Sequence, residues 1–278
     1  MENHNHAIAE HFNMTYVSDE KADADLQKKL DIEYHRNAAA KYDRDITSYF
    51  HFYHVYSLHP WIQRLLKRRP GAAVADLGTG TGIVACTLAK FGCRVRAIDH
   101  SPEMLAIALE RAKADGVASL IQFDLGDGEK LPYPDASFDA VTIQGVLHHL
   151  PDNGPLLREA NRILKNGGEL YISEPCVGSP FISRFLNQAL PWLKRILRFG
   201  KGEQTVSEHE APISGTAVIT EIERLGMKAQ AEYLVNVGAV RYLPFSLRIW
   251  AVLALSAPTR RRAGDLVFVI ARKGDSAS

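Results

Sequence analysis

The sequence predicts an α/β fold in which helices cover both faces of a mostly parallel, doubly wound sheet. The apolar run at 73–77 is typical of a buried parallel strand, and the glycines after it form a tight turn before a helix-like run at 83–90. A second apolar run, 93–99, ends on an acid about 20 residues beyond that turn. Strand-like and helix-like segments then alternate as far as residue 175, which is the pattern of successive βαβ units.

The glycine turn predicts a ligand site. A Cβ at Gly78 or Gly80 would occupy the space that a ligand needs. Two phosphate-binding motifs are excluded by the spacing. The third glycine of a dinucleotide fingerprint would fall at Ile83, and no Lys-Ser or Lys-Thr pair follows the glycines. An ordinary turn with chance glycines is the structural alternative.

The run from Asp76 to Gly82, D-L-G-T-G-T-G, resembles the first motif of class I S-adenosylmethionine-dependent methyltransferases. The resemblance extends from about Tyr34 to Pro175. It implies a Rossmann-like sheet of seven strands with the last strand antiparallel, and S-adenosylmethionine as the cofactor. The turn would accommodate the amino-acid end and the ribose of this donor, and free N–H groups at the helix start would receive the donor carboxylate.

The resemblance also implies which residues bind the donor. Asp99 stands where a nucleotide fold places an acid for the ribose hydroxyls. His100 and Met104 would flank the adenosine, and Asp127 with Gly128 would meet the adenine amino group. The complete expected set is Tyr42, Asp76, Gly78, Thr79, Gly80, Gly82, Asp99, His100, Met104, Asp127, Gly128 and Gln144.

Outside the core, the resemblance and the apolar patterning predict a cap and a lid. Tyr42 lies in an A-x-x-Y-D element similar to the family segment that folds over the donor, although a core-packing role fits it equally well. Segments 181–198 and 237–257 are expected to form an apolar lid, with a core helix and a membrane-surface helix as alternatives for the first. The expected parts are a mobile arm at 1–29, a helical cap at 30–70, a donor-binding core at 71–175, and the rest of the sheet with lid insertions at 176–278.

Two histidines and a glutamate are the candidate catalytic groups. His148 and His149 follow one expected strand, and Glu174 lies at the end of the next. If these strands are neighbours, their carboxyl ends open on the same crevice. A histidine oriented by a carboxylate is a suitable base because its pKa lies near the working pH and the carboxylate fixes its tautomer. A packed, backbone-bonded histidine pair is the alternative.

Composition favours a cytoplasmic enzyme. The formal net charge of +1 argues against an extended nucleic-acid surface. The three cysteines lack metal-ligand spacing, so we expect neither a metal site nor a disulfide framework. Neither a signal peptide nor an uncharged apolar stretch of about 18 residues is found, so no membrane span is expected, while peripheral membrane contact stays open. The oligomeric state is not indicated.

The expected function is methyl transfer from S-adenosylmethionine to a small, largely apolar acceptor, at oxygen or carbon rather than nitrogen. Three alternatives remain. An NAD-dependent oxidoreductase is disfavoured by Ile83. A donor-binding regulatory or interaction module would bind the donor without turnover. A third alternative is a member of the fold that uses the bound donor in a non-methylating reaction such as decarboxylation or rearrangement.

Overall fold

The computed structural model describes residues 57–176, 213–234 and 266–274. The expectations for the N-terminal arm, for Tyr42 and for both lid segments fall outside the described residues. The described part contains the whole predicted donor-binding core from residue 71 to residue 175.

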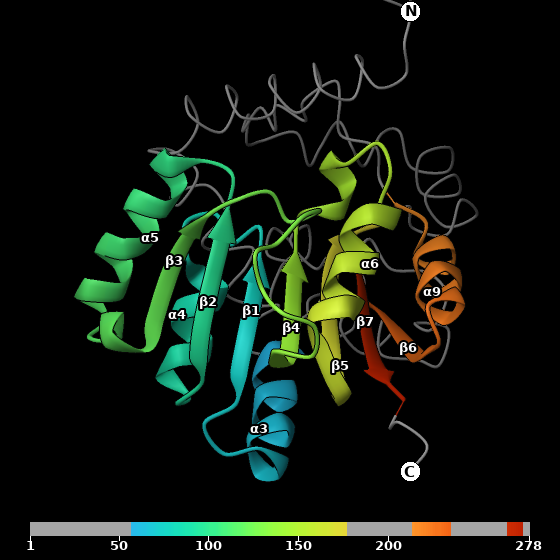
Figure 1. The fold of residues 1–278 in the computed structure, drawn as a ribbon, viewed down its shortest axis with the longest axis horizontal. Helices are drawn as coiled ribbons and strands as arrows, with labels where there is room; N and C mark the ends of the chain where they lie inside the picture. The colour runs from blue at the N-terminus through green and yellow to red at the C-terminus, as the bar shows by residue number, and fades with distance from the viewer. Residues whose placement is uncertain (1–56, 177–212, 235–265, 275–278) are drawn as a thin grey trace, which may run out of the picture.

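A seven-stranded sheet forms the centre of the molecule (Figure 1), and its strand order is β3-β2-β1-β4-β5-β7-β6. Neighbouring strands from β1 to β5 are parallel, whereas β7 is antiparallel to both β5 and β6. The expected sheet with an antiparallel last strand is therefore confirmed. The strands are β1 Ala73–Leu77, β2 Arg94–Asp99, β3 Ile121–Leu125, β4 Phe138–Gln144, β5 Leu164–Pro175, β6 Met227–Leu234 and β7 Leu266–Lys273.

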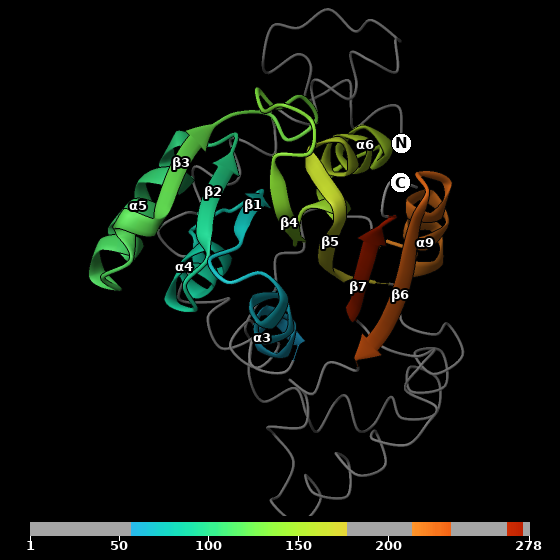
Figure 2. The same ribbon diagram turned by 60° about the horizontal axis from the view of Figure 1, so that its bottom comes forward.

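Helices cover both faces of this sheet. Apolar residues of α3, α4 and α5 join one buried cluster, and those of α6 and α9 join the other. Figure 2 shows α6 and α9 on one side of the sheet and α3 and α4 on the other. The helices are α3 His59–Arg68, α4 Ile83–Lys90, α5 Pro102–Ala114, α6 Gly154–Ile163 and α9 Gly215–Arg224. No helix among the described residues is long and apolar enough to cross a bilayer.

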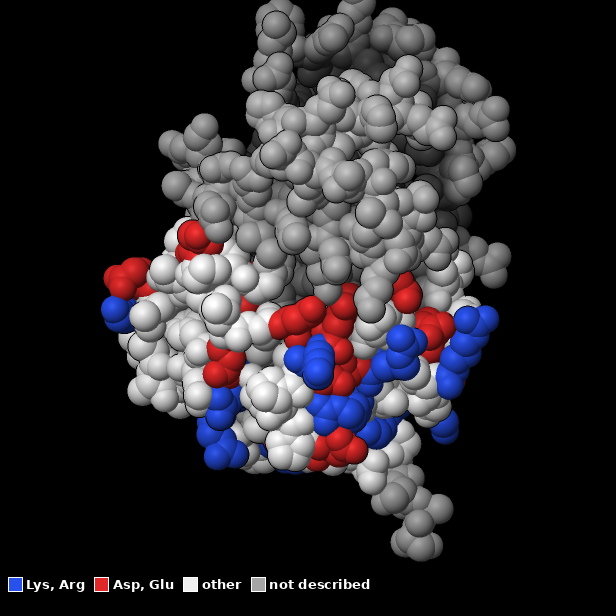
Figure 3. Space-filling view, turned by 45° about the horizontal axis from the view of Figure 1, so that its top comes forward, with Lys and Arg blue, Asp and Glu red and all other residues white. Residues whose placement is uncertain are grey.

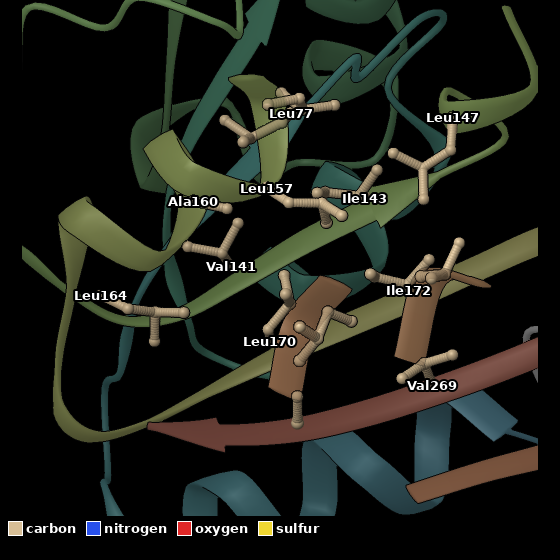
Figure 4. Packing of buried hydrophobic residues seen from close by; sticks show 14 of the residues in the cluster. Leu77, Val141, Ile143, Leu147, Leu157, Ala160, Leu164, Leu170, Ile172 and Val269 are labelled. Carbon is tan, nitrogen blue, oxygen red and sulfur yellow. The ribbon is translucent and has the colours of Figure 1, made fainter. Parts of the chain in front are cut away.

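The central strands are buried on both faces, which explains their continuous apolar runs. Val74 belongs to the cluster under α3 and α4, and its neighbour Ala75 belongs to the cluster under α6 and α9. The second cluster brings Leu77, Val141 and Leu157 together, as Figure 4 shows. All three are fully buried, so the strand ends that carry the site rest on a close-packed base.

Some element boundaries differ from those that the apolar pattern predicts, which places the third strand at 120–123, the fifth at 169–175 and a helix at 221–225. Leu120 was expected to begin the third strand, but it ends a short 3₁₀ helix, and β3 runs from Ile121 to Leu125. Strand β5 was expected to begin at Glu169, but it begins at Leu164, which pairs with Phe138 before a shift in register. Helix α9 was expected over 221–225 and spans Gly215–Arg224, because the side chain of Ser214 accepts a hydrogen bond from the Ala217 N–H and starts the helix earlier.

Candidate active site

The turn after β1 contains three glycines with left-handed backbones. Gly78, Gly80 and Gly82 have φ values of 70°, 53° and 78°, a region that L side chains rarely adopt. The N–H groups of Gly78 and Thr79 both donate to the carbonyl of Ile98, each at 2.9 Å, which fixes the start of the turn to β2. The backbone conformation of the turn is therefore by itself a reason for glycine at these three positions.

The surroundings of the three glycines differ. A Cβ on Gly80 would meet no atom of the described residues within 4 Å, so none of them fills the space where the sequence predicts a ligand. A Cβ on Gly78 would lie 2.3 Å from Cγ2 of Val146, so protein rather than ligand fills that space. A Cβ on Gly82 would lie 2.7 Å from the Cβ of Ala108, because the turn packs against α5 there.

Asp76, near the end of β1, is buried and forms hydrogen bonds to two threonine hydroxyls. Its Oδ1 accepts the hydroxyl of Thr142 and its Oδ2 accepts the hydroxyl of Thr79, both at 2.6 Å. Only 1% of Asp76 is exposed. Burial raises the pKa of Asp76 from 3.8 to about 6, although both hydroxyls and the Ala85 amide oppose the shift. Asp76 thus ties the glycine turn to β4.

Asp99, at the end of β2, links the turn to the next loop. Its Oδ2 accepts the N–H of Gly80 at 2.7 Å, and its Oδ1 accepts the N–H of Ser101 at 2.9 Å. A carboxylate offers about four acceptor positions, so two bonds leave capacity for hydroxyl donors. Asp99 therefore lies at the turn where the sequence placed a ribose-binding acid.

Gln144 ends β4 beside the same turn. Its Oε1 atom is buried and has no hydrogen-bond partner among the described residues. A buried acceptor without a partner costs about 1–3 kcal/mol, unless a ligand supplies a donor. This atom and the free space at Gly80 fit a ligand that carries an N–H donor, such as the ammonium group of S-adenosylmethionine.

His148 and Glu174 are in direct contact. Nδ1 of His148 lies 2.8 Å from Oε2 of Glu174, and the glutamate is fully buried. Oε1 of the same carboxylate accepts the N–H groups of Val146 and Leu147 at 2.7 and 2.9 Å. Because a buried carboxylate accepts hydrogen bonds, the proton of neutral His148 lies on Nδ1 and leaves Nε2 to accept one.

His149 occupies a different position. Its ring lies beside that of His148, with centroids 4.0 Å apart and planes 39° apart, and its backbone N–H donates to the carbonyl of Val146 at 3.0 Å. Glu174 therefore contacts the first of the two histidines, a choice that the sequence left open. No cluster of three or more metal-ligating side chains occurs among the described residues.

The expected adenosine-side residues lie on the loops after β2 and β3 and in the first turn of α5. His100 is exposed, whereas Met104 is buried on α5, and its N–H donates to the Ser101 hydroxyl at 3.2 Å. Asp127 is exposed, and its Oδ1 accepts the N–H of Glu129 at 3.0 Å. A Cβ on Gly128 would lie 2.8 Å from Leu156 of α6, so this glycine allows the loop to approach the helix.

Two residues of the site were missed by the sequence reasoning. Thr142 was expected only as part of a strand, but it is the register partner of Asp76 across β1 and β4 and bonds its carboxylate. Val146 covers Gly78. Neither residue type signals a ligand site, and only the pairing of β1 with β4 reveals their positions.

Similarity to known proteins agrees with this geometry. Residues 75–172 match the methyltransferase domain family. The chain is 37% identical over 105 residues to methyltransferase GfsG of Streptomyces halstedii, covering 37% of this chain and 38% of that protein. It is 36% identical over 138 residues to demethylmenaquinone methyltransferase of Tropheryma whipplei, covering 48% of this chain and 56% of that protein. The aligned parts thus span about half or less of these relatives.

A solved structure extends the likeness in fold. It is a chain of the complex between the Haloferax volcanii Trm112 methyltransferase activator and a methyltransferase, with a TM-score of 0.58 and 22% identity. The match covers 86% of this chain and 97% of that chain.

The fold and the site define an α/β protein with a glycine turn at the carboxyl end of its first parallel strand. With the family match, they show that the chain carries a domain that belongs to the class I S-adenosylmethionine-dependent methyltransferases.

Proposed function

We propose that this protein transfers the methyl group of S-adenosylmethionine to a small, largely apolar acceptor, at a hydroxyl or an acidic carbon. The observation that carries the proposal is the contact between His148 and Glu174. His148 follows β4, the strand next to β1, and the glycine turn follows β1. Methyl transfer to a weakly acidic group needs a donor site and an oriented base close together, and both would lie at the carboxyl ends of neighbouring strands.

The donor would occupy the space beside the glycine turn and bond to acceptor atoms that can still receive a hydrogen bond. The free space at Gly80 would admit the donor backbone, and Oε1 of Gln144 would accept its ammonium group. Asp99 would accept ribose hydroxyls while it continues to hold the turn. Bound there, S-adenosylmethionine supplies a sulfonium methyl that is already activated, so the task of the protein is alignment, which is worth up to roughly 7–11 kcal/mol.

His148 would serve as the base. With Nδ1–H donated to Glu174, its Nε2 would take the proton of the acceptor O–H as that oxygen becomes nucleophilic. The imidazolium would then be stabilised by the buried Glu174 carboxylate beside it. The two backbone N–H bonds to Oε1 hold that carboxylate in place. A carbon acid would lose its proton to the same nitrogen.

The described loops favour an uncharged acceptor. The loops after β1, β2 and β4, at 78–82, 100–101 and 145–153, contain no Lys or Arg, so they offer no permanent cation for a phosphate or carboxylate group, and the loop after β3 contains one, Lys130. The relative from Tropheryma whipplei is named for demethylmenaquinone, an apolar quinone, which supports the same class.

Nucleic acid is not expected as a partner. On the described part of the face in Figure 3, Lys and Arg side chains are interspersed with Asp and Glu rather than gathered in a basic patch. Arg162, for example, pairs with Glu159 and Asp135, both at 2.6 Å. A nucleic-acid surface would instead leave its cations available to phosphates.

A labelled-methyl assay tests the proposal. The protein is incubated with methyl-labelled S-adenosylmethionine and three probes: reduced demethylmenaquinone, catechol and an anionic benzoate as the charge control. We expect label in the quinol or catechol product with one S-adenosylhomocysteine per methyl, and none in benzoate. Gly80→Val should abolish the transfer by filling the free space. Product formation without label, or failure of the protein to bind S-adenosylhomocysteine, would overturn the proposal.

A further inference from the structure

The glycine turn and the histidine loop meet at one side chain. The Cγ2, Cγ1 and Cβ atoms of Val146 lie 2.3, 3.3 and 3.4 Å from the position that a Cβ on Gly78 would occupy. The isopropyl group of Val146 therefore lies directly over the Gly78 backbone. Gly78 is held in turn by its N–H bond to the Ile98 carbonyl at 2.9 Å, so the turn has little freedom to move away.

The backbone of Val146 is itself held by hydrogen bonds to β5 and to the histidine loop. Its N–H donates to Oε1 of Glu174 at 2.7 Å, and its carbonyl accepts the N–H of His149 at 3.0 Å. The preceding residue, Gly145, has a φ of 66° and donates its N–H to the carbonyl of Ser173 at 2.9 Å. The backbone that carries the valine is therefore attached to β5 at two points.

These contacts form one continuous connection from the donor turn to the imidazole. Gly78 contacts Val146, Val146 bonds Oε1 of Glu174, and Oε2 of the same carboxylate bonds Nδ1 of His148. The side chain of Val146 is the only apolar link in this connection. Close-packed interiors transmit displacements because they hold few voids, so a shift of the turn would reach His148 through this valine.

We propose that Val146 is a positioning residue, whose side chain sets the separation between the donor turn and the His148 imidazole. The inference rests on the proposed donor site and base. Alignment errors of about 1 Å can cost 10²-fold in rate, so a spacer between the two parts has a large effect without touching either reactant. Valine fits this role because its branched Cβ leaves it few rotamers.

The test measures the connection without an acceptor. Imidazole signals of His148 are followed by NMR, assigned with His148→Gln, while S-adenosylhomocysteine is added, and calorimetry gives the affinity of each variant. This probe carries no sulfonium charge, so it minimises direct electrostatic effects on the ring. We expect the His148 signals of the unmodified protein to shift on binding. In Val146→Ala the shift should fall to about half or less, with affinity retained within about threefold.

Two further variants make the test independent of folding defects. Val146→Leu keeps an apolar side chain, one methylene larger, but moves the branch point from Cβ to Cγ, so it should also reduce the shift. Val141→Ala also removes two methyl groups, at a fully buried position within β4 in the cluster that Val146 packs against, and should lower stability but leave the shift unchanged.

The outcomes separate the inference from the proposed function. Three results would overturn the role of Val146 and leave the donor site standing. The His148 signals could shift as far in Val146→Ala or Val146→Leu as in the unmodified protein, or Val141→Ala could reduce the shift as much as Val146→Ala does. The unmodified protein could also bind S-adenosylhomocysteine without any shift of these signals. No binding of S-adenosylhomocysteine by the unmodified protein would overturn the donor site itself.

Discussion

Asp99 holds the apex of the glycine turn, because its Oδ2 accepts the Gly80 N–H at 2.7 Å. The same carboxylate accepts the Ser101 N–H through Oδ1, so one side chain joins the turn to the start of α5. The acid that the sequence assigned to a ribose therefore also has a structural task.

Asp99→Ala should weaken binding of S-adenosylhomocysteine by about tenfold to more than a hundredfold. A charge-assisted hydrogen bond worth roughly 1.5–3 kcal/mol is lost, and Gly80 loses its hydrogen bond to the end of β2. Isothermal calorimetry measures the change. Asp99→Asn is the matched control, since its carbonyl can keep one of the two backbone bonds and its loss should be smaller. Unchanged affinity in Asp99→Ala would contradict the role of this acid.

Gly82→Ala should lower the free energy of unfolding more than Gly80→Ala. Both positions impose the left-handed backbone cost of about 1–2 kcal/mol, but only the Cβ at position 82 collides with Ala108, which adds about 1–3 kcal/mol. Urea unfolding of the two variants measures the difference. Equal losses would mean that α5 moves to accommodate the new methyl group without cost.

Glu174→Gln should reduce turnover by roughly 10²–10⁴ while the fold is retained. The glutamine oxygen can still accept the N–H groups of Val146 and Leu147, but its amide nitrogen donates to Nδ1 of His148 and moves the imidazole proton to Nε2. NMR of the imidazole nitrogens reports this tautomer change directly. His148→Ala should show a similar loss, and His149→Ala a smaller one. Full turnover in Glu174→Gln would contradict a role of this pair in proton transfer, and the alignment of donor and acceptor would then account for catalysis.

Asp76 should make stability fall as the pH rises through mildly acidic values. Burial raises its folded pKa from 3.8 to about 6, so the protonated form is favoured in the folded protein. Its contribution is therefore complete below pH 3.8 and is lost as the pH rises to about 6. The total change is about 3 kcal/mol, from roughly 1.4 kcal/mol per pKa unit.

Urea unfolding across this pH range measures the slope. Asp76→Asn should flatten it, because the group that titrates is gone. Thr142→Val should extend the slope to higher pH, because the Thr142 hydroxyl opposes the rise in the pKa of Asp76. The same slope in Asp76→Asn and in the unmodified protein would assign the pH dependence to other groups.

Much of the fold could be predicted from the sequence because its signals are local. Apolar runs and left-handed glycines specify the βα turn after β1 without reference to the rest of the chain. The meeting of His148 and Glu174 was also predictable, because residues at the ends of neighbouring parallel strands share one edge of the sheet.

The remaining features depend on pairing between distant strands. The contact of Thr142 with Asp76 follows from the register of β1 on β4, which no single segment encodes. The choice of His148 over its neighbour depends on the 3₁₀ turn of Leu147–His149, which turns one ring toward Glu174. The early start of β5 reflects the pairing of Leu164 with Phe138, in a stretch whose glycines resemble a helix end.

The place of β7 in the sheet also affects how the chain can fold during synthesis. β7 follows β6 along the chain but lies between β5 and β6, and it is the only strand that β6 pairs with among the described residues. On the ribosome, β5 would keep an open edge and β6 would have no partner until β7 emerges. The strand that carries Glu174 is thus completed by a segment that lies far downstream of it in the chain, so a nascent chain without β7 would expose the edge of β5 to aggregation.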